Sequence, residues 1–229
     1  MTQHFLREIE KLKKRLLTLS ALVEENLHCA IKSLLERNDA LARQAVDRDN
    51  EIDQMEVDIE EECLKVLALH QPVAIDLRFL VALLKINNDL ERIGDLAVNI
   101  AERTLFLSRL EPVVVKFDFP TMVEIAKSML KRSIDALVSM NTLLAEEVCA
   151  ADDEVDDMNR QMYREIQQAI REQPEHAEPL LHLLAVSRHL ERIADHTTNI
   201  AEDVIYMVDG VIARHRMDEY AAKPGTPAE

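Results

Sequence analysis

One thirteen-residue segment occurs twice in this chain. Residues 90–102 read LERIGDLAVNIAE and residues 190–202 read LERIADHTTNIAE, with identity at nine of the thirteen positions. A match of this kind at a fixed period indicates a repeated structural unit. Upstream the offset is 103 instead of 100, a contraction that a loop tolerates. The corresponding residues there are Asn38 with Asn141, Asp49 with Asp152, Asp53 with Asp156, and Met55 with Met158.

Helix breakers are scarce, and they separate six long segments. The sequence contains three glycines, and its first 71 residues contain no proline. Because these two residues are the most unfavourable inside helices, the composition predicts an all-α fold. Asp39 and Thr142 are the predicted N-caps of two helices, since a short side-chain oxygen can accept first-turn N–H groups. The expected helices cover residues 3–36, 39–70, 73–109, 119–140, 142–172 and 176–214.

Three of these helices fall in each half of the chain. Apolar residues recur at helical spacing, and short connections make neighbouring helices antiparallel. We therefore predict two tandem, structurally similar three-helix bundles. The first would occupy residues 1–112 and the second residues 113–215, followed by a flexible tail over residues 216–229. We interpret the β-branched stretch 110–120 as the linker, because a single short strand would have no partner.

The charge of the chain narrows the classes of partner. A formal net charge of −16 repels phosphate backbones and anionic lipid headgroups, which argues against nucleic-acid or membrane-surface binding. No stretch approaches the roughly 18 apolar residues of a membrane span, and the amino terminus lacks the apolar centre of a signal peptide. We expect a cytoplasmic protein without direct membrane insertion. Its cysteines, Cys29, Cys63 and Cys149, are expected to be reduced core residues.

Four acidic pairs share a spacing of four residues, which places both carboxylates of a pair on one helix face. They are Asp49/Asp53, Glu91/Asp95, Asp152/Asp156 and Glu191/Asp195. The first two pairs lie equally far from the turn at Pro72, and the last two lie equally far from the turn at Gln173 and Pro174. In antiparallel hairpins, the pairs of each half would therefore face one another at the same level.

Four clustered carboxylates do not all stay ionised unless protons or cations neutralise them, so these positions predict two metal sites. Oxygen ligands favour iron, manganese, magnesium or calcium, and carboxylates also accept zinc. The same polar stripe continues with possible further ligands: Asn99, Glu102, Asn199 and Glu202. Two alternatives need no metal. Solvated helix faces in a chain with 43 acidic residues show such pairs by chance, and Arg92 and Arg192 could neutralise the carboxylates.

These motifs resemble those of the PhoU family of phosphate-transport accessory regulators. The likeness rests on the doubled LERI(G/A)D…NIAE segment, on the acidic motifs in DRDNEID and ADDEVD, and on AIDLRFL at residues 74–80, and it covers roughly residues 5–214. It implies metal clusters on two similar bundles. The family's acidic motifs fall on Glu91, Asp95, Glu191 and Asp195, with Asp49, Asp53, Asp152 and Asp156 opposite them.

The resemblance also implies a role. Members act with the phosphate ABC transporter and its membrane sensor histidine kinase to keep phosphate-starvation genes off when phosphate is plentiful. We therefore expect a homodimeric negative regulator that is not an enzyme and that associates with the inner membrane through its partners. The sequence departs from strict repetition at two places: AIDLRFL has no second copy, and Ala194 stands in the place of Gly94.

Two other functions remain open at this level. A di-iron carboxylate protein of ferritin type also places acids on facing helices, but it uses Glu-x-x-His from two helices. Here only Glu25 and His28 have that spacing, once, and they lie outside the repeated acidic pairs. A metal-free helical scaffold is the other alternative. His196 is a weaker candidate ligand, since its counterpart in the first half is Leu96.

Overall fold

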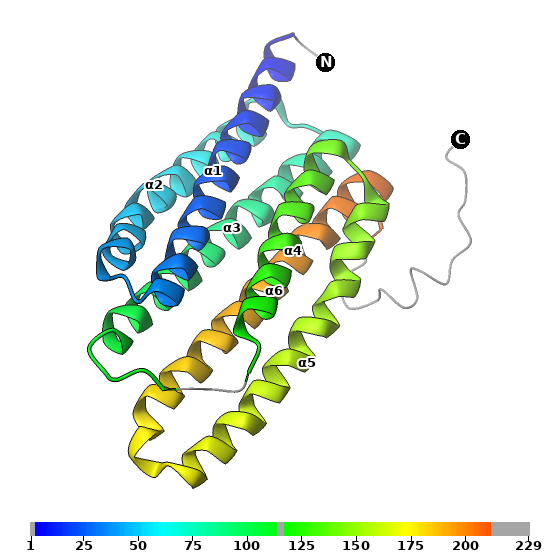
Figure 1. Ribbon diagram of the computed structural model, residues 1–229. Coiled ribbons are helices and arrows are strands. Elements are labelled where there is room, and N and C mark those ends of the chain that lie inside the picture. Colours follow the sequence, from blue (N-terminus) through cyan, green and yellow to red (C-terminus); the bar gives the residue numbers. More distant parts are fainter. Residues whose placement is uncertain (1–2, 114–116, 212–229) are drawn as a thin grey trace.

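The computed structural model describes residues 3–113 and 117–211, and Figure 1 shows an all-α architecture over this part of the chain. The predicted helices are confirmed to within a few residues. A single 3-10 turn, Pro174–His176, precedes the last helix. The helices are α1 Gln3–Glu36, α2 Asp39–His70, α3 Ala74–Leu107, α4 Phe119–Ser139, α5 Thr142–Glu172 and α6 Ala177–Asp209.

The predicted N-caps are wrong by one residue in both repeats. Asn38 has extended backbone, and its Oδ1 accepts hydrogen bonds from the Ala40 and Leu41 N–H groups at 3.0 and 3.2 Å. Asn141 does the same for Leu144 at 3.2 Å. Both sequences place two residues that can cap side by side, and the asparagine takes the non-helical position that a cap requires.

The last helix is shorter than predicted. It ends at Asp209 instead of residue 214, because Gly210 adopts a left-handed conformation with φ of 71° and its N–H bonds to the Tyr206 carbonyl. Glycine is favoured at such a position because it has no Cβ to clash. The tail predicted over residues 216–229 lies outside the described residues.

Each bundle consists of three consecutive helices that pack on one another: α1, α2 and α3 in the first, and α4, α5 and α6 in the second. The bundles meet mainly through α3 and α6, which run through the middle of the molecule in Figure 1. One apolar core contains side chains from all six helices. Two tandem three-helix bundles are therefore present, and the division at residue 112 stays a prediction because the bundles share this core.

The two central helices run in opposite directions. Near one end, Lys85 of α3 pairs with Asp203 of α6 at 2.8 Å. Near the other, the Phe106 ring stacks on the His182 ring with centroids 3.9 Å apart. Residue numbers therefore increase along α3 in the direction in which they decrease along α6, so the two helices are antiparallel. The acidic motifs of the two repeats therefore lie at nearly the same level of the molecule.

The remaining sequence expectations concern the linker, membrane spans and cysteines. The described residues of the linker, 110–113 and 117–118, form no strand, and residues 114–116 lie outside the described part. Within the described residues, no helix has both the length and the apolar character needed to cross a bilayer. Cys29 and Cys63 are buried free thiols and Cys149 is partly buried. Burial, followed by nearby carboxylates, raises the pKa of Cys63 and Cys149 to about 12.

Candidate metal centres

The first acidic cluster lies where α2 crosses the doubled motif of α3. Gly94 allows this approach: a Cβ at Gly94 would lie 3.2 Å from Ile52 Cγ2 and 3.3 Å from Asp49 Oδ1. The Asp49 side chain therefore rests against the backbone of α3 between Glu91 and Asp95. Asp49 therefore lies beside the acidic motif of α3, as the sequence predicted.

The carboxylates of this cluster perturb one another. Burial, followed by the charges of Asp53 and Asp95, raises the pKa of Asp49 to about 6. Burial also raises the pKa of Glu91, with Asp95 the next largest cause. These effects act across the α2–α3 contact, so residues predicted from both helices belong to one electrostatic unit.

The second repeat builds the same unit from α5 and α6. Burial, followed by the charges of Asp195 and Asp156, raises the pKa of Asp152 to about 6. Burial raises the pKa of Glu191 and of Asp195 as well, with Asp195 and Asp156, respectively, as the next cause. The two clusters thus correspond residue by residue at the positions that the repeat aligns.

Each cluster contains a buried carboxylate oxygen without a donor. Asp49 Oδ1 and Asp152 Oδ1 have no hydrogen-bond partner among the described residues. A buried polar atom without a partner is unfavourable, and a buried anionic oxygen is more so. The same orphan atom at the same place in both repeats is what a site for a cation would leave, so the residues present fit a bound metal ion.

Arginines neutralise part of each cluster, and they differ between the repeats. Arg92 pairs with Asp95 at 3.0 Å and with Glu91 at 3.3 Å. In the second repeat, Arg160 of α5 pairs with Asp156 at 3.2 Å. The ion-pair alternative therefore describes some of the carboxylates, but neither arginine makes a hydrogen bond to the orphan oxygen of Asp49 or Asp152.

The clusters are open arrangements. Among the described residues, no three of these carboxylates bring their oxygens within 4.8 Å of one another. A tetrahedral or octahedral ion with oxygen ligands at about 2.0–2.2 Å would require the side chains to close around it. Asp53 and Asp195 are exposed, and the other six carboxylates are partly buried.

The further candidate ligands are placed differently from one another. Asn99 donates to the Asp95 carbonyl at 2.8 Å, and Asn199 donates to Asp89 of α3 at 3.3 Å. Glu102 is exposed and Glu202 is buried, so these two do not share an environment. The Asn199 side chain thus reaches across the contact between the bundles.

Two other predicted candidates lie elsewhere. His196 Nδ1 lies 2.8 Å from Asp89 Oδ1 across the α3–α6 contact. The His196 side chain is only 18% exposed, so His196 is not a surface residue. Glu25, of the ferritin-like spacing, is exposed and pairs with Arg48 at 3.2 Å. That ion pair holds Glu25 outside the acidic cluster.

Comparisons with known proteins extend over both repeats. The PhoU domain model matches residues 16–104 and again residues 119–204. The PhoU homologue of Aquifex aeolicus is 40% identical over 210 residues, which cover 92% of this chain and 95% of that protein. PhoU homologue 1 of Thermotoga maritima is 36% identical over 211 residues, covering 90% of both chains. Both are named phosphate-specific transport system accessory proteins.

Solved structures agree with this fold. The crystal structure of PhoU from Pseudomonas aeruginosa superposes with a TM-score of 0.88 at 35% identity and covers 90% of this chain and 100% of that one. The phosphate transport system regulatory protein PhoU from Streptococcus pneumoniae gives a TM-score of 0.81 at 27% identity and covers 91% and 98%. On its repeated sequence, its paired bundles and these matches, the chain belongs to the PhoU family.

Proposed function

We propose that this protein regulates phosphate transport as an accessory of the phosphate ABC transporter and represses the phosphate-starvation response through a membrane sensor histidine kinase. The observation that carries the proposal is the match of both repeats, over nearly the whole chain, to proteins named as transport accessory or regulatory proteins. In this proposal the protein acts as a homodimer in the cytoplasm, beside the inner membrane, and catalyses no reaction.

The proposal includes one metal centre in each bundle. Asp49, Asp53, Glu91 and Asp95 would hold an ion in the first, and Asp152, Asp156, Glu191 and Asp195 would hold one in the second. The orphan oxygens of Asp49 and Asp152 support this assignment. An oxygen-preferring ion such as iron, manganese or magnesium, or zinc, would neutralise the carboxylates and connect neighbouring helices. These centres would stabilise the surface that partners recognise.

A gene-deletion strain tests the regulatory role. Deleting the gene is expected to raise phosphatase expression in high phosphate, and the unaltered gene is expected to restore repression. A gene carrying both Asp49→Asn and Asp152→Asn is expected to restore less. Exposed Asp47 provides a matched control, since Asp47→Asn is expected to restore repression fully. Normal repression in the deletion strain would reject the proposed role.

Partner identity needs a second experiment. The protein is used to capture membrane proteins from cells grown in high and in low phosphate, followed by mass spectrometry. Components of the phosphate ABC transporter and a histidine kinase are expected, with amounts that depend on phosphate. Capture of neither component in either condition would contradict the coupling. Sedimentation of the purified protein measures the expected dimer.

A further inference from the structure

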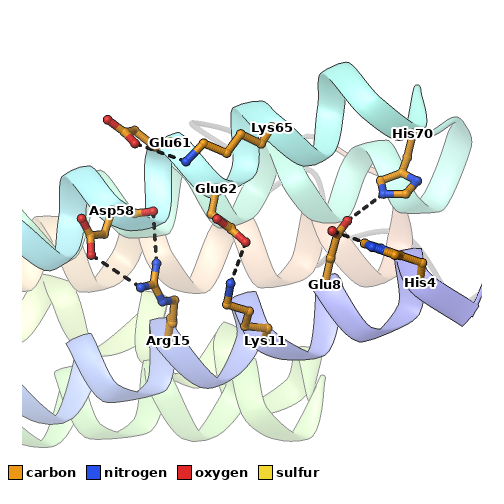
Figure 2. A network of polar contacts seen from close by, with 9 residues as sticks. All are labelled: His4, Glu8, Lys11, Arg15, Asp58, Glu61, Glu62, Lys65 and His70. Atoms are coloured by element: carbon orange, nitrogen blue, oxygen red, sulfur yellow. Dashed lines mark hydrogen bonds and ion pairs between the residues drawn. The ribbon is translucent and has the colours of Figure 1, made fainter.

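A second kind of cluster lies far from the acidic centres, at the end of the first bundle where α1 begins and α2 ends. Figure 2 shows Glu8 between His4 and His70. His4 Nδ1 lies 3.1 Å from Glu8 Oε1, and His70 Nε2 lies 2.7 Å from Glu8 Oε2. Within the described residues, this is the one group of three such side chains whose possible ligand atoms all lie within 4.8 Å of one another.

Packing holds two members of the cluster in place. The side chains of Glu8 and His70 are each 20% exposed, and the Phe5 ring packs edge-on against His70 with centroids 5.2 Å apart. Figure 2 also shows ion pairs farther along the two helices, in which Lys11 binds Glu62 at 2.8 Å and Arg15 contacts Asp58. These contacts fix the register of α1 against α2, so Glu8 and His70 are held opposite one another.

The geometry is close to that of a coordinated ion. Bonds of about 2.1 Å to a tetrahedral zinc ion place neighbouring ligand atoms about 3.4 Å apart. One possible ligand atom from each of the three side chains lies within 4.8 Å of the others. Glu8 Oε1 is 3.1 Å from His4 and Glu8 Oε2 is 2.7 Å from His70, so an ion would replace two short contacts made by different oxygens. His4 is the adaptable member, because its side chain is 72% exposed and can rotate toward the ion.

Ligand chemistry selects the class of ion. Imidazole nitrogen suits zinc, copper, nickel and iron, whereas magnesium and calcium prefer oxygen ligands alone. The unpaired carbonyls at the end of α2 favour a cation, and the start of α1 disfavours one, so the two helix ends roughly cancel. The two imidazoles and the carboxylate therefore decide the affinity. Three protein ligands leave a coordination position open to solvent beside exposed His4.

We propose that His4, Glu8 and His70 form a binding site for a borderline divalent transition metal, with zinc as the representative ion. The site is separate in position and in ligand type from the carboxylate centres, and it does not rest on the proposed regulatory function. A bound ion would connect the first turn of α1 to the last turn of α2. The alternative is that Glu8 holds both histidines through hydrogen bonds alone.

Zinc titration of the tag-free, chelator-treated full-length protein tests the site. The titration is done in the Asp49→Asn/Asp152→Asn background, which weakens the carboxylate centres, and one equivalent of zinc is expected to bind there. His4→Gln, His70→Gln and Glu8→Gln are each expected to weaken this binding by more than about 100-fold. Cobalt gives a second readout, because a four-coordinate site with imidazole ligands produces strong visible absorption that the three variants should lose.

A matched histidine and a melting experiment complete the test. His176 lies partly buried in the 3-10 turn, and His176→Gln is expected to leave zinc binding and the cobalt spectrum unchanged. In the same Asp49→Asn/Asp152→Asn background, which is the parent here, zinc is expected to raise the melting temperature. It is not expected to do so once His70→Gln is added. Circular dichroism checks that each variant is folded. The proposal fails if His4→Gln and His70→Gln bind zinc as tightly as the parent. It also fails if they lower the melting temperature equally with and without zinc, since the hydrogen-bonded arrangement predicts that result.

Discussion

His196 of α6 lies 2.8 Å from Asp89 of α3, measured from Nδ1 to Oδ1, and this contact joins the two bundles across their shared face. Asp89 is only 8% exposed, and its other contact is the Asn199 amide at 3.3 Å. A buried carboxylate depends on such partners, because an unpaired one is strongly unfavourable. The place of His196 in the first repeat is taken by Leu96, so this contact occurs once in the molecule.

Replacing His196 with the residue of the other repeat tests the contact. His196→Leu removes the closest partner of Asp89 and is expected to lower the free energy of unfolding by about 1–3 kcal/mol. Urea unfolding followed by circular dichroism measures the change. His28→Leu, at an exposed histidine of α1, is expected to change it by less than about 0.5 kcal/mol. Equal stabilities for the parent and His196→Leu would show that Asp89 finds another partner.

Loss of one carboxylate from each acidic cluster should remove bound metal. Asp49→Asn and Asp152→Asn are each expected to weaken one centre, and the double variant is expected to weaken both. Affinity should fall by at least about tenfold at each centre, because the loss of a group that supports a metal already has an effect of that size. Plasma mass spectrometry of tag-free protein measures the content. Asp47→Asn is the control. If the double variant retained all of its metal, the metal would be bound by residues other than these carboxylates.

Stability of the metal-free protein should depend on pH through Asp49 and Asp152. Their pKa values rise from 3.8 to about 6 on folding, so the folded state holds more protons than the unfolded state in this interval. Stability from these groups is therefore complete below pH 3.8 and is lost as pH rises through about 6. Scanning calorimetry in chelator should show a smaller loss for Asp49→Asn/Asp152→Asn than for the parent over this range. Parallel profiles would contradict the assignment.

A substitution at Gly94 should change the metal affinity of the first centre with little effect on the stability of the protein. In Gly94→Ala the new Cβ would press on Ile52 and Asp49 at 3.2 and 3.3 Å. Overpacking of this kind is unfavourable by about 1 kcal/mol or more, while alanine improves helix propensity by about 1 kcal/mol. The melting temperature should therefore change little. Displacement of Asp49 should weaken the first centre relative to the second, and metal titration should then resolve two unequal sites. A large loss of stability with two equal sites would be the opposite result.

The sequence predicted the fold well because its strongest signals are local and repeated. Scarce breakers located the helix ends, and equal distances from the turn at Pro72 placed Asp49 opposite Glu91 and Asp95. The exact residues at which helices begin and end were harder to predict from the sequence. Asn38 and Asp39 are both suitable caps, and only the backbone conformation decides between them. The end of α6 at Asp209 had a signal in Gly210, which the prediction passed over.

The cluster of His4, Glu8 and His70 was missed because it occurs once and joins distant residues. A repeat cannot reveal a feature that only one half contains. A usable signal was nevertheless present: Glu8 and His70 lie almost equally far from the turn at Asn38. The hairpin argument that paired the carboxylates would have placed these two residues opposite one another. The pairing of Asp89 with His196 had no such signal, because it depends on how the bundles dock.

The antiparallel pairing of α3 with α6 gives one chain the form of a two-fold dimer. The third helix of each repeat packs on the third helix of the other. Because a single chain supplies both halves, the two surfaces outside this contact need not be identical. The cluster of His4, Glu8 and His70, which lies in the first half, is one such difference within the described residues.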